Sequence, residues 1–307
     1  MTLFVFAFRR LLLLLLVVLA VSSLLFVLIR LSGDPVSILA PPEASPEILD
    51  QLRAELGLDD SMAVQYARFL RDSAKLDFGV SFRFARPALD VVVERLPATL
   101  MLGAVSMLVT LMIAFPLGIL SALKSQSIFA YVSMMATFVL QAMPAFWLGV
   151  LLIFIFSVEF RLLPSFGYGQ LKHLILPSLT LAGFMLAKTS RFVRTSLRQV
   201  LEAQYIQVAR AKGLSEKSIV LKHALKNALI PVITVLGLDI AGLVGGAVVT
   251  ETIFAWPGMG RLLVQSASGR DYPVVQASVF LVTLIVVAVN FAVEISYRYF
   301  DPRIGWD

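Results

Sequence analysis

The sequence predicts an all-α integral membrane protein with six transmembrane helices. Hydrophobic residues make up 59% of its 307 residues and charged residues only 15%, whereas soluble domains contain about 45–50% and about 25%. A soluble fold of this size could not bury so much apolar surface, so a lipid bilayer is the expected solvent. Two further observations support this class: six separate stretches are long and apolar enough to cross a bilayer, and one strongly basic segment indicates the orientation.

The composition also limits the chemistry of the chain. There is no cysteine, which excludes thiol catalysis, disulfides and cysteine-ligated metal sites. The only histidines are His173 and His223, so a histidine-based metal site is not expected. A net charge of +6 could suggest a nucleic-acid partner in a soluble protein. Here membrane topology explains the charge, and no nucleic-acid partner is expected.

Each predicted span is a run of about 20 mostly apolar residues. In order, the runs cover residues 11–29, 99–123, 129–157, 174–187, 228–249 and 274–295. The first resembles a signal peptide, but its apolar run continues past the small residues 20–22 and is too long for one. We therefore expect an uncleaved anchor helix over residues 1–30. The fourth is the weakest, because it contains Pro177 and ends at Lys188.

Six spans place both termini on the same side of the membrane. Short loops rich in Lys and Arg remain in the cytoplasm, and residues 191–226 are the most basic part of the chain. This segment therefore indicates cytoplasmic termini. We expect a transmembrane core over residues 99–298 and a cytoplasmic tail over residues 299–307.

Residues 31–98 form a predicted extracytoplasmic region with two helices. A serine, a proline and a glutamate at positions 45–47 are typical of a helix start. Apolar residues then recur at helical spacing until Gly57, which should end the helix. A second amphipathic helix is expected over about residues 61–75. This region either covers the bundle or provides a docking surface for an outer partner, and both roles can hold together.

The cytoplasmic segment 197–227 predicts a helix, a glycine break and a second helix. Gly213 follows the basic residues Arg210 and Lys212, as a helix C-cap should, and Ser215 can cap the next helix. An apolar stripe is expected along Leu197, Val200, Leu201, Tyr205 and Val208. Taken alone, such a basic amphipathic unit is more often a membrane-surface or solvated element than a docking element.

Short motifs recur in a fixed order along the whole chain. The central one is the run Ala209, Arg210, Ala211, Lys212, Gly213, Leu214 and Ser215, followed by residues 222–231. Further fragments lie at residues 31–35, 56–59, 77–79, 96–100, 144–149, 163–164, 176–179, 251–261, 271–273 and 301–304. Together they resemble the permeases of ABC importers of the dipeptide/oligopeptide/nickel family, in particular the first of the two permease subunits. Gln207 and Lys226 stand where the general ABC motif has glutamate and proline, so no role is carried over to Gln207.

The resemblance implies a type I ABC importer permease fold in a bacterial or archaeal inner membrane. The chain would be a non-catalytic permease that forms half of a translocation path in a heterodimer with a second, homologous permease subunit. Two cytoplasmic ABC ATPases would use ATP and Mg, and each would grip the coupling segment of one permease, where Arg210 and Lys212 would pair with acidic groups. No cofactor is expected in this chain, which has no G-x-x-x-x-G-K-[ST] phosphate loop. An extracytoplasmic binding protein would deliver the substrate: peptides first, with nickel, glutathione and sugars as alternatives.

Polar residues in and beside the spans are candidates for the translocation path. Asp239 lies in the middle of the fifth span, where a carboxylate must face a partner or water. It either meets a peptide amino group in the path or is a hydrogen-bonded interface residue. Asn290 in the sixth span is also a candidate, although a structural role is favoured there. An outer gate or binding-protein docking site is a further hypothesis for Glu251, Trp256, Pro257 and Gly258.

Small residues and prolines predict how the spans pack. Gly237, Ala241 and Gly245 have a spacing that lets helices approach closely, within the bundle or against the second permease. Pro116 and Pro144 should kink the second and third spans.

Two other classes of protein are less consistent with the sequence than an importer subunit. A stand-alone, ion-coupled secondary transporter using Asp239 would favour several intramembrane ionisable residues and an internal repeat. The sequence has one central acid and no repeat. An intramembrane enzyme is disfavoured because H-E-x-x-H and G-x-S-x-G are absent and the two histidines lie on opposite sides of the predicted membrane.

Overall fold

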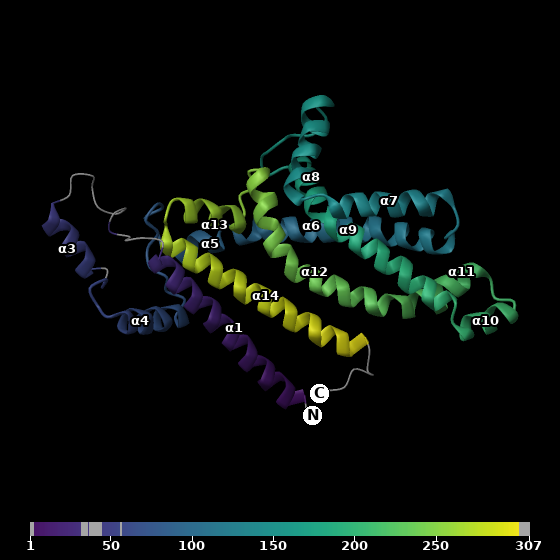
Figure 1. Ribbon diagram of the computed structural model, residues 1–307, viewed down its shortest axis with the longest axis horizontal. Coiled ribbons are helices and arrows are strands. Elements are labelled where there is room, and N and C mark those ends of the chain that lie inside the picture. Colours follow the sequence, from purple (N-terminus) through teal and green to yellow (C-terminus); the bar gives the residue numbers. More distant parts are fainter. Residues whose placement is uncertain (1–2, 32–35, 37–44, 56, 301–307) are drawn as a thin grey trace. The chain divides into compact units, whose positions relative to one another are not determined.

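The computed structural model describes residues 3–31, 36, 45–55 and 57–300, and the regular structure in these residues is helical apart from one bridge between Val80 and Pro87. The helices of Figure 1 are α1 (Leu3–Leu31), α3 (Pro46–Glu55), α4 (Met62–Ala74), α5 (Ala88–Val93), α6 (Leu96–Leu123), α7 (Ile128–Ala142), α8 (Ala145–Leu152), the π-helical turn η1 (Ile153–Glu159), α9 (Leu171–Leu201), α10 (Gln204–Ala211), α11 (Glu216–Ser218), the π-helical turn η2 (Ile219–Ala224), α12 (Leu225–Ile253), α13 (Met259–Ser268) and α14 (Tyr272–Phe300). Most of the predicted tail 299–307, and parts of the motifs at 31–35, 56–59 and 301–304, lie outside the described residues.

The helices that could span a membrane largely follow the prediction. Four are long and apolar enough in the described part of the chain, at Leu12–Leu31, Ala88–Leu123, Glu216–Gly237 and Tyr272–Glu294. The third of these starts at Glu216 rather than at residue 228, so it includes part of the segment predicted to be cytoplasmic and overlaps the predicted fifth span only at residues 228–237. A fifth is added if α7 and the α8–η1 helix, which are bent by 109° to each other, count as one broken span. The predicted third span is therefore two helices rather than one. The predicted fourth lies within α9, which is not among the apolar spans; charged residues flank its apolar stretch on both sides, Lys172 before it and Lys188 after it.

The prolines behave differently from one another. Pro144 lies at the break between α7 and α8, so the expected kink is present and is a sharp bend. By contrast, α6 continues through Pro116 without a break.

The contacts divide the chain into two compact units. Among the described residues, one consists of those before residue 99 together with 257–287, and the other of residues 99–256 together with 288–300. The regions predicted from the sequence, with boundaries at residues 30, 98 and 298, are defined by function and not by contacts. They therefore remain predictions.

In the first unit, the two helices predicted after the anchor are confirmed. α3 begins at Pro46, and Gly57 follows it with a φ of +63°. α4 is flanked by Ser61 and Lys75, as expected. The loop after α4 is fixed by the buried Asp271, whose carboxylate accepts hydrogen bonds from the Ser81 hydroxyl (2.5 Å) and from backbone amides of the loop.

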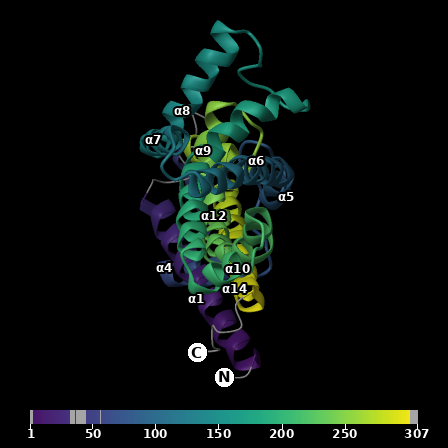
Figure 2. The ribbon, with the colours of Figure 1, turned by 90° about the vertical axis from the view of Figure 1, so that its right-hand side faces the viewer.

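The second unit is built on α9 and α12, which lie side by side in both views (Figures 1 and 2). α7 and α8 also pack on α9. Glycines allow these close approaches: a Cβ on Gly118 would lie 2.7 Å from the Ser190 carbonyl oxygen of α9, and one on Gly183 would lie 2.5 Å from Leu148. In contrast, a Cβ on Gly242 or Gly245 would meet no described atom within 4 Å. Part of the small-residue face of α12 is therefore uncovered within the described residues.

Candidate functional site

The predicted cytoplasmic helix pair is confirmed, and its turn is centred on Gly213. α10 ends at Ala211, and Gly213 adopts a φ of +78°. The amides of Gly213 and Leu214 donate to the carbonyls of Arg210 (2.9 Å) and Ala209 (3.3 Å). This is the Schellman pattern, which satisfies the free carbonyls at a helix end and requires a left-handed residue. The Ser215 hydroxyl then caps α11 by accepting from the Ser218 amide.

The helix pair is packed firmly onto the ends of α9 and α12. Ile206 of α10 and Ile219 of η2 are completely buried. They share a hydrophobic cluster with Leu197 and Leu201 of α9 and with Ala228 of α12. Because interiors of this kind transmit strain rather than deform freely, a displacement of α10 should move the adjoining ends of α9 and α12 with it. We call residues 204–224 the cytoplasmic knob.

The predicted apolar stripe is only partly correct. Leu197 and Leu201 are buried, but Tyr205 and Val208 are 46% and 49% exposed. The helical period does not continue, because the chain leaves α9 after Leu201 and starts α10 at Gln204. Four apolar side chains of the knob are exposed: Tyr205, Val208, Leu214 and Leu221.

The basic residues of the knob differ in their pairing. The Arg210 guanidinium donates to both carboxylate oxygens of Glu216, at 2.7 and 3.3 Å. This pairing lowers the pKa of Glu216 below its ordinary value and raises that of Arg210. Lys212 is exposed and has no acidic partner among the described residues. Of the two cations expected to meet acids on another chain, Lys212 is thus the one that this chain leaves available.

Removing the Arg210–Glu216 pair should leave the stability of the chain almost unchanged. An exposed pair contributes at most about 1 kcal/mol. Because the folded pKa of Glu216 is lowered, the pair stabilises the fold above the unfolded pKa of about 4.3 and loses this effect only as the pH falls through the lowered value. We expect the Glu216→Gln and wild-type chains to have nearly equal melting temperatures, with parallel profiles of stability between pH 6 and 8. A divergence within that range would contradict this assignment.

Asp239 forms an ion pair with Lys188, which the sequence indicates only as the end of the predicted fourth span. Lys188 Nζ donates to Asp239 Oδ1 at 2.7 Å, joining α9 to α12. The side chain of Asp239 is 7% exposed and that of Lys188 is 26% exposed. Asp239 is the isolated acid of an apolar stretch and so needs a partner, but Lys188 begins a basic run, so the sequence does not single it out as that partner. Asn290 is exposed on α14, and the described contacts do not bring it to Asp239.

The residues considered for an outer gate are mostly buried. Glu251 accepts a hydrogen bond from the Thr99 hydroxyl at 2.7 Å and is fully buried. Trp256 is also fully buried, its amide donates to the Glu251 carbonyl, and its ring meets the edge of Tyr168. Pro257 is half-buried, and Gly258 precedes α13. This geometry supports a packed corner more than an exposed docking loop.

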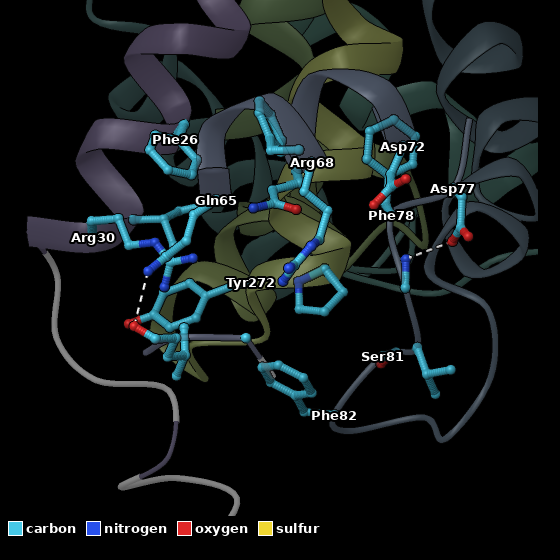
Figure 3. A pocket seen from close by; sticks show the side chains of 18 of the residues that line it. Phe26, Arg30, Gln65, Arg68, Asp72, Asp77, Phe78, Ser81, Phe82 and Tyr272 are labelled. Carbon is cyan, nitrogen blue, oxygen red and sulfur yellow. Dashed lines mark hydrogen bonds between the residues drawn. The ribbon is translucent and has the colours of Figure 1, made fainter. Parts of the chain in front are cut away.

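The first unit contains a cavity of about 650 Å³ beside the loop after α4. Figure 3 shows side chains of α1, α4 and the start of α14 around it, among them Arg30, Gln65 and Tyr272. The Gln65 amide nitrogen donates to the carbonyls of Leu58 and Asp60, which holds the turn between α3 and α4. The cavity thus lies in the region expected to cover the bundle or to meet an outer partner.

Two family models match the chain over most of its length. Residues 114–306 match the inner membrane component of binding-protein-dependent transport systems, and residues 3–103 match the N-terminal part of such a membrane component. The chain belongs to this family. The resemblance drawn from the motifs is therefore confirmed, and the permease is a bacterial inner-membrane protein.

Curated relatives align with this permease from end to end. A dipeptide transport system permease protein, DppB, of Alkalihalophilus pseudofirmus is 37% identical and covers 98% of this chain and 99% of its own length. The glutathione transport system permease protein GsiC of Escherichia coli is 40% identical with the same coverage. The oligopeptide transport system permease protein AppB of Bacillus subtilis is 38% identical, covering 97% of this chain and 98% of its own length.

Solved structures support the fold. An inward-facing MetNI methionine ABC transporter matches with a TM-score of 0.56 at 21% identity, covering 69% of this chain and 96% of that chain. An amino acid ABC transporter matches with a TM-score of 0.53 at 16% identity, covering 68% and 94%. The permease therefore has the type I ABC importer fold that the motifs implied.

Proposed function

We propose that this permease is the first of two permease subunits in a bacterial importer of dipeptides or oligopeptides, with both of its termini in the cytoplasm. The named functions of the relatives support peptides as cargo, with the glutathione relative as a tripeptide-like case. The proposed partners are a second permease subunit, two ABC ATPases that bind ATP and Mg, and an extracytoplasmic binding protein. The first unit, with its cavity in Figure 3, is the proposed docking region for that binding protein.

The knob carries the proposal for coupling. Its exposed apolar side chains, Tyr205, Val208 and Leu214, suit a hydrophobic groove on an ATPase, and Lys212 can meet an acid at the rim. Closure of the ATPases around ATP would push the knob, and the buried cluster around Ile206 would pass this displacement to α9 and α12. The single observation behind this mechanism is the continuous core between knob and spans.

Val208→Asp should therefore weaken the association with the ATPases. It replaces an exposed apolar side chain of α10 with a charge that a hydrophobic groove must desolvate. We expect the amount of ATPase that co-purifies with the permease to fall at least fivefold. The matched control is Gln204→Asp, which adds the same charge to the first turn of the same helix without removing an apolar contact. Equal ATPase recovery with both variants would contradict the groove contact.

The whole proposal is tested by tagging the chain, extracting it gently from its native membrane and identifying what co-purifies. A second six-span permease and one or two phosphate-loop ATPases are expected, and the complex should import peptides into proteoliposomes only with ATP and the binding protein. A chain that purifies alone and supports ion-driven uptake without ATP would overturn the proposal. The ion-coupled alternative is not favoured, because Asp239 is already neutralised by Lys188.

A further inference from the structure

A cavity of about 410 Å³ lies between α7 and the part of α9 that leads to the knob. Apart from Met134 of α7, its lining residues come from α9 and the residue after it, and all of these are polar. They include three arginines, Arg191, Arg194 and Arg198, and one acid, Glu202. We call this space the arginine cavity. An excess of positive charge in a confined space attracts an anionic occupant.

Two of the arginines have only weak partners. Arg194 Nη1 donates to Met134 Sδ at 2.9 Å, and the guanidinium carbon of Arg191 lies 5.4 Å from the centroid of the Phe138 ring. Both arginines are half-buried, and neither forms an ion pair within the residues that the structure describes. A thioether is a weak acceptor. A phosphate, with several charged oxygens, matches the planar fork of a guanidinium far better.

The other charged pair of the cavity does not cancel this excess. Arg198 Nε donates to Glu202 Oε1 at 3.3 Å, and the two side chains are 56% and 68% exposed. An exposed pair of this kind is weak. The two terminal nitrogens of Arg198 make no hydrogen bond to the described residues, so they can also reach an anion at the rim.

The side of the arginine cavity formed by α7 continues into an exposed apolar face. Tyr131 and Phe138 lie about one turn before and after Met134, so the three residues share one face of the helix. Tyr131 is 58% exposed and Phe138 is 45% exposed. Because Arg191 lies over the Phe138 ring, the charged and apolar surfaces adjoin directly. An occupant that covers both surfaces needs an anionic end and an apolar end.

The position of the cavity along the helices suits a lipid headgroup. α7 belongs to the broken span that is apolar enough to cross a membrane. It begins at Ile128, so Met134 lies roughly 9 Å along the axis from the end of the span. Headgroups occupy a layer about 5–7 Å thick at each face of a bilayer, and arginine side chains extend to keep their charge at that level.

We propose that the arginine cavity binds the phosphate group of an anionic phospholipid, whose acyl chains lie along the face of α7 that carries Tyr131 and Phe138. Arg191 and Arg194 donate hydrogen bonds to the phosphate oxygens, and Arg198 adds positive charge at the rim. Phosphatidylglycerol fits better than phosphatidylethanolamine, because no ammonium group in its headgroup offsets the phosphate charge. The inference is independent of the cargo and needs only that α7 and α9 lie in a membrane.

The test is photo-cross-linking of the purified permease complex in vesicles of phosphatidylethanolamine. The vesicles contain a trace of phosphatidylglycerol or of phosphatidylethanolamine with a diazirine in one acyl chain, and mass spectrometry quantifies the labelled α7 peptide. We expect phosphatidylglycerol to label α7 about tenfold more than phosphatidylethanolamine. Arg194→Gln should lower this preference about fivefold, which corresponds to one basic residue near a lipid surface. Neither arginine pairs with a described acid, so the double variant Arg191→Gln with Arg194→Gln leaves no such acid unpaired and should abolish the preference.

Lys226→Gln is the matched control, since it removes one exposed positive charge from the first turn of α12, outside the lining. It should keep the full preference. Equal labelling by the two lipids, no labelling of α7 by either, an unchanged preference in the double variant or an equal loss in Lys226→Gln would each overturn the lipid site. Displacement of phosphatidylglycerol by excess inorganic phosphate would indicate a site for free phosphate instead, and displacement by trialanine would indicate a site for a peptide carboxylate.

Discussion

Replacing Gly213 with valine is expected to reduce ATP-driven uptake at least tenfold while the permease still inserts in the membrane. Gly213 has a φ of +78°, where a residue with a Cβ costs about 1–3 kcal/mol and a β-branched residue is a genuine outlier. A Cβ there would meet no described atom within 4 Å, so strain in the backbone is the only direct effect. Relieving it would break the Schellman turn and reorient α10 against α11. The measurement is peptide uptake and substrate-stimulated ATP hydrolysis in proteoliposomes, normalised to the amount of inserted permease.

Two control variants distinguish the effect of strain in the Gly213 turn from the effects of any side chain at this position and of similar strain elsewhere in the chain. Gly213→Asn should retain most of the uptake, because asparagine tolerates the left-handed region. Gly169→Val introduces the same kind of strain at a φ of +89°, also with open space around its Cβ, but in the loop before α9. It should leave coupling between uptake and ATP hydrolysis intact. Normal uptake by Gly213→Val would argue against a coupling role for residues 209–215.

Local signals in the sequence were sufficient for the parts of the fold that local physics determines. The start of α3, the extent of α4 and the turn at Gly213 each depend on a few neighbouring residues, and all three are found where they are predicted. The apolar stripe predicted through Tyr205 is wrong because it depends on a change of chain direction that neighbouring residues do not reveal. One helical period was extended across residues 202–203, where the chain changes direction to bury Ile206.

Interactions between distant residues explain the remaining differences. Lys188 weakens the predicted fourth span, yet α9 continues past it, and Asp239, 51 positions later, provides a counter-charge for the lysine. A hydropathy average lowers the score of the span for this lysine and contains no information about its pairing with a distant aspartate. Similarly, Pro144 predicted a kink, but the size of the 109° bend depends on how α8 packs against α9 and α12. The burial of Glu251 depends in the same way on Thr99, 152 positions earlier.

Gly118→Ala should be the most damaging single-methyl change in the second unit. The added Cβ would lie 2.7 Å from both the Ser190 carbonyl oxygen and Val193 Cβ of α9. Neither neighbour can move cheaply, since the first is backbone in a helix and Val193 is 1% exposed. Overpacking of this kind costs about 1–3 kcal/mol or more. We expect a melting temperature several degrees lower for the purified complex and less permease in the membrane.

Gly103→Ala is the matched comparison, because it adds the same methyl group to the same helix, α6. There the nearest described atom would be Leu243 Cδ1, at 4.0 Å, which is an ordinary contact. Alanine is also favoured over glycine in a helix by about 1 kcal/mol, so this variant should be as stable as wild type or slightly more stable. A lower melting temperature for Gly118→Ala together with an unchanged or higher one for Gly103→Ala is expected. This result would show that the close contact between α6 and α9 stabilises the unit, rather than a general need for glycine in α6. Equal melting temperatures for the two variants would contradict that packing.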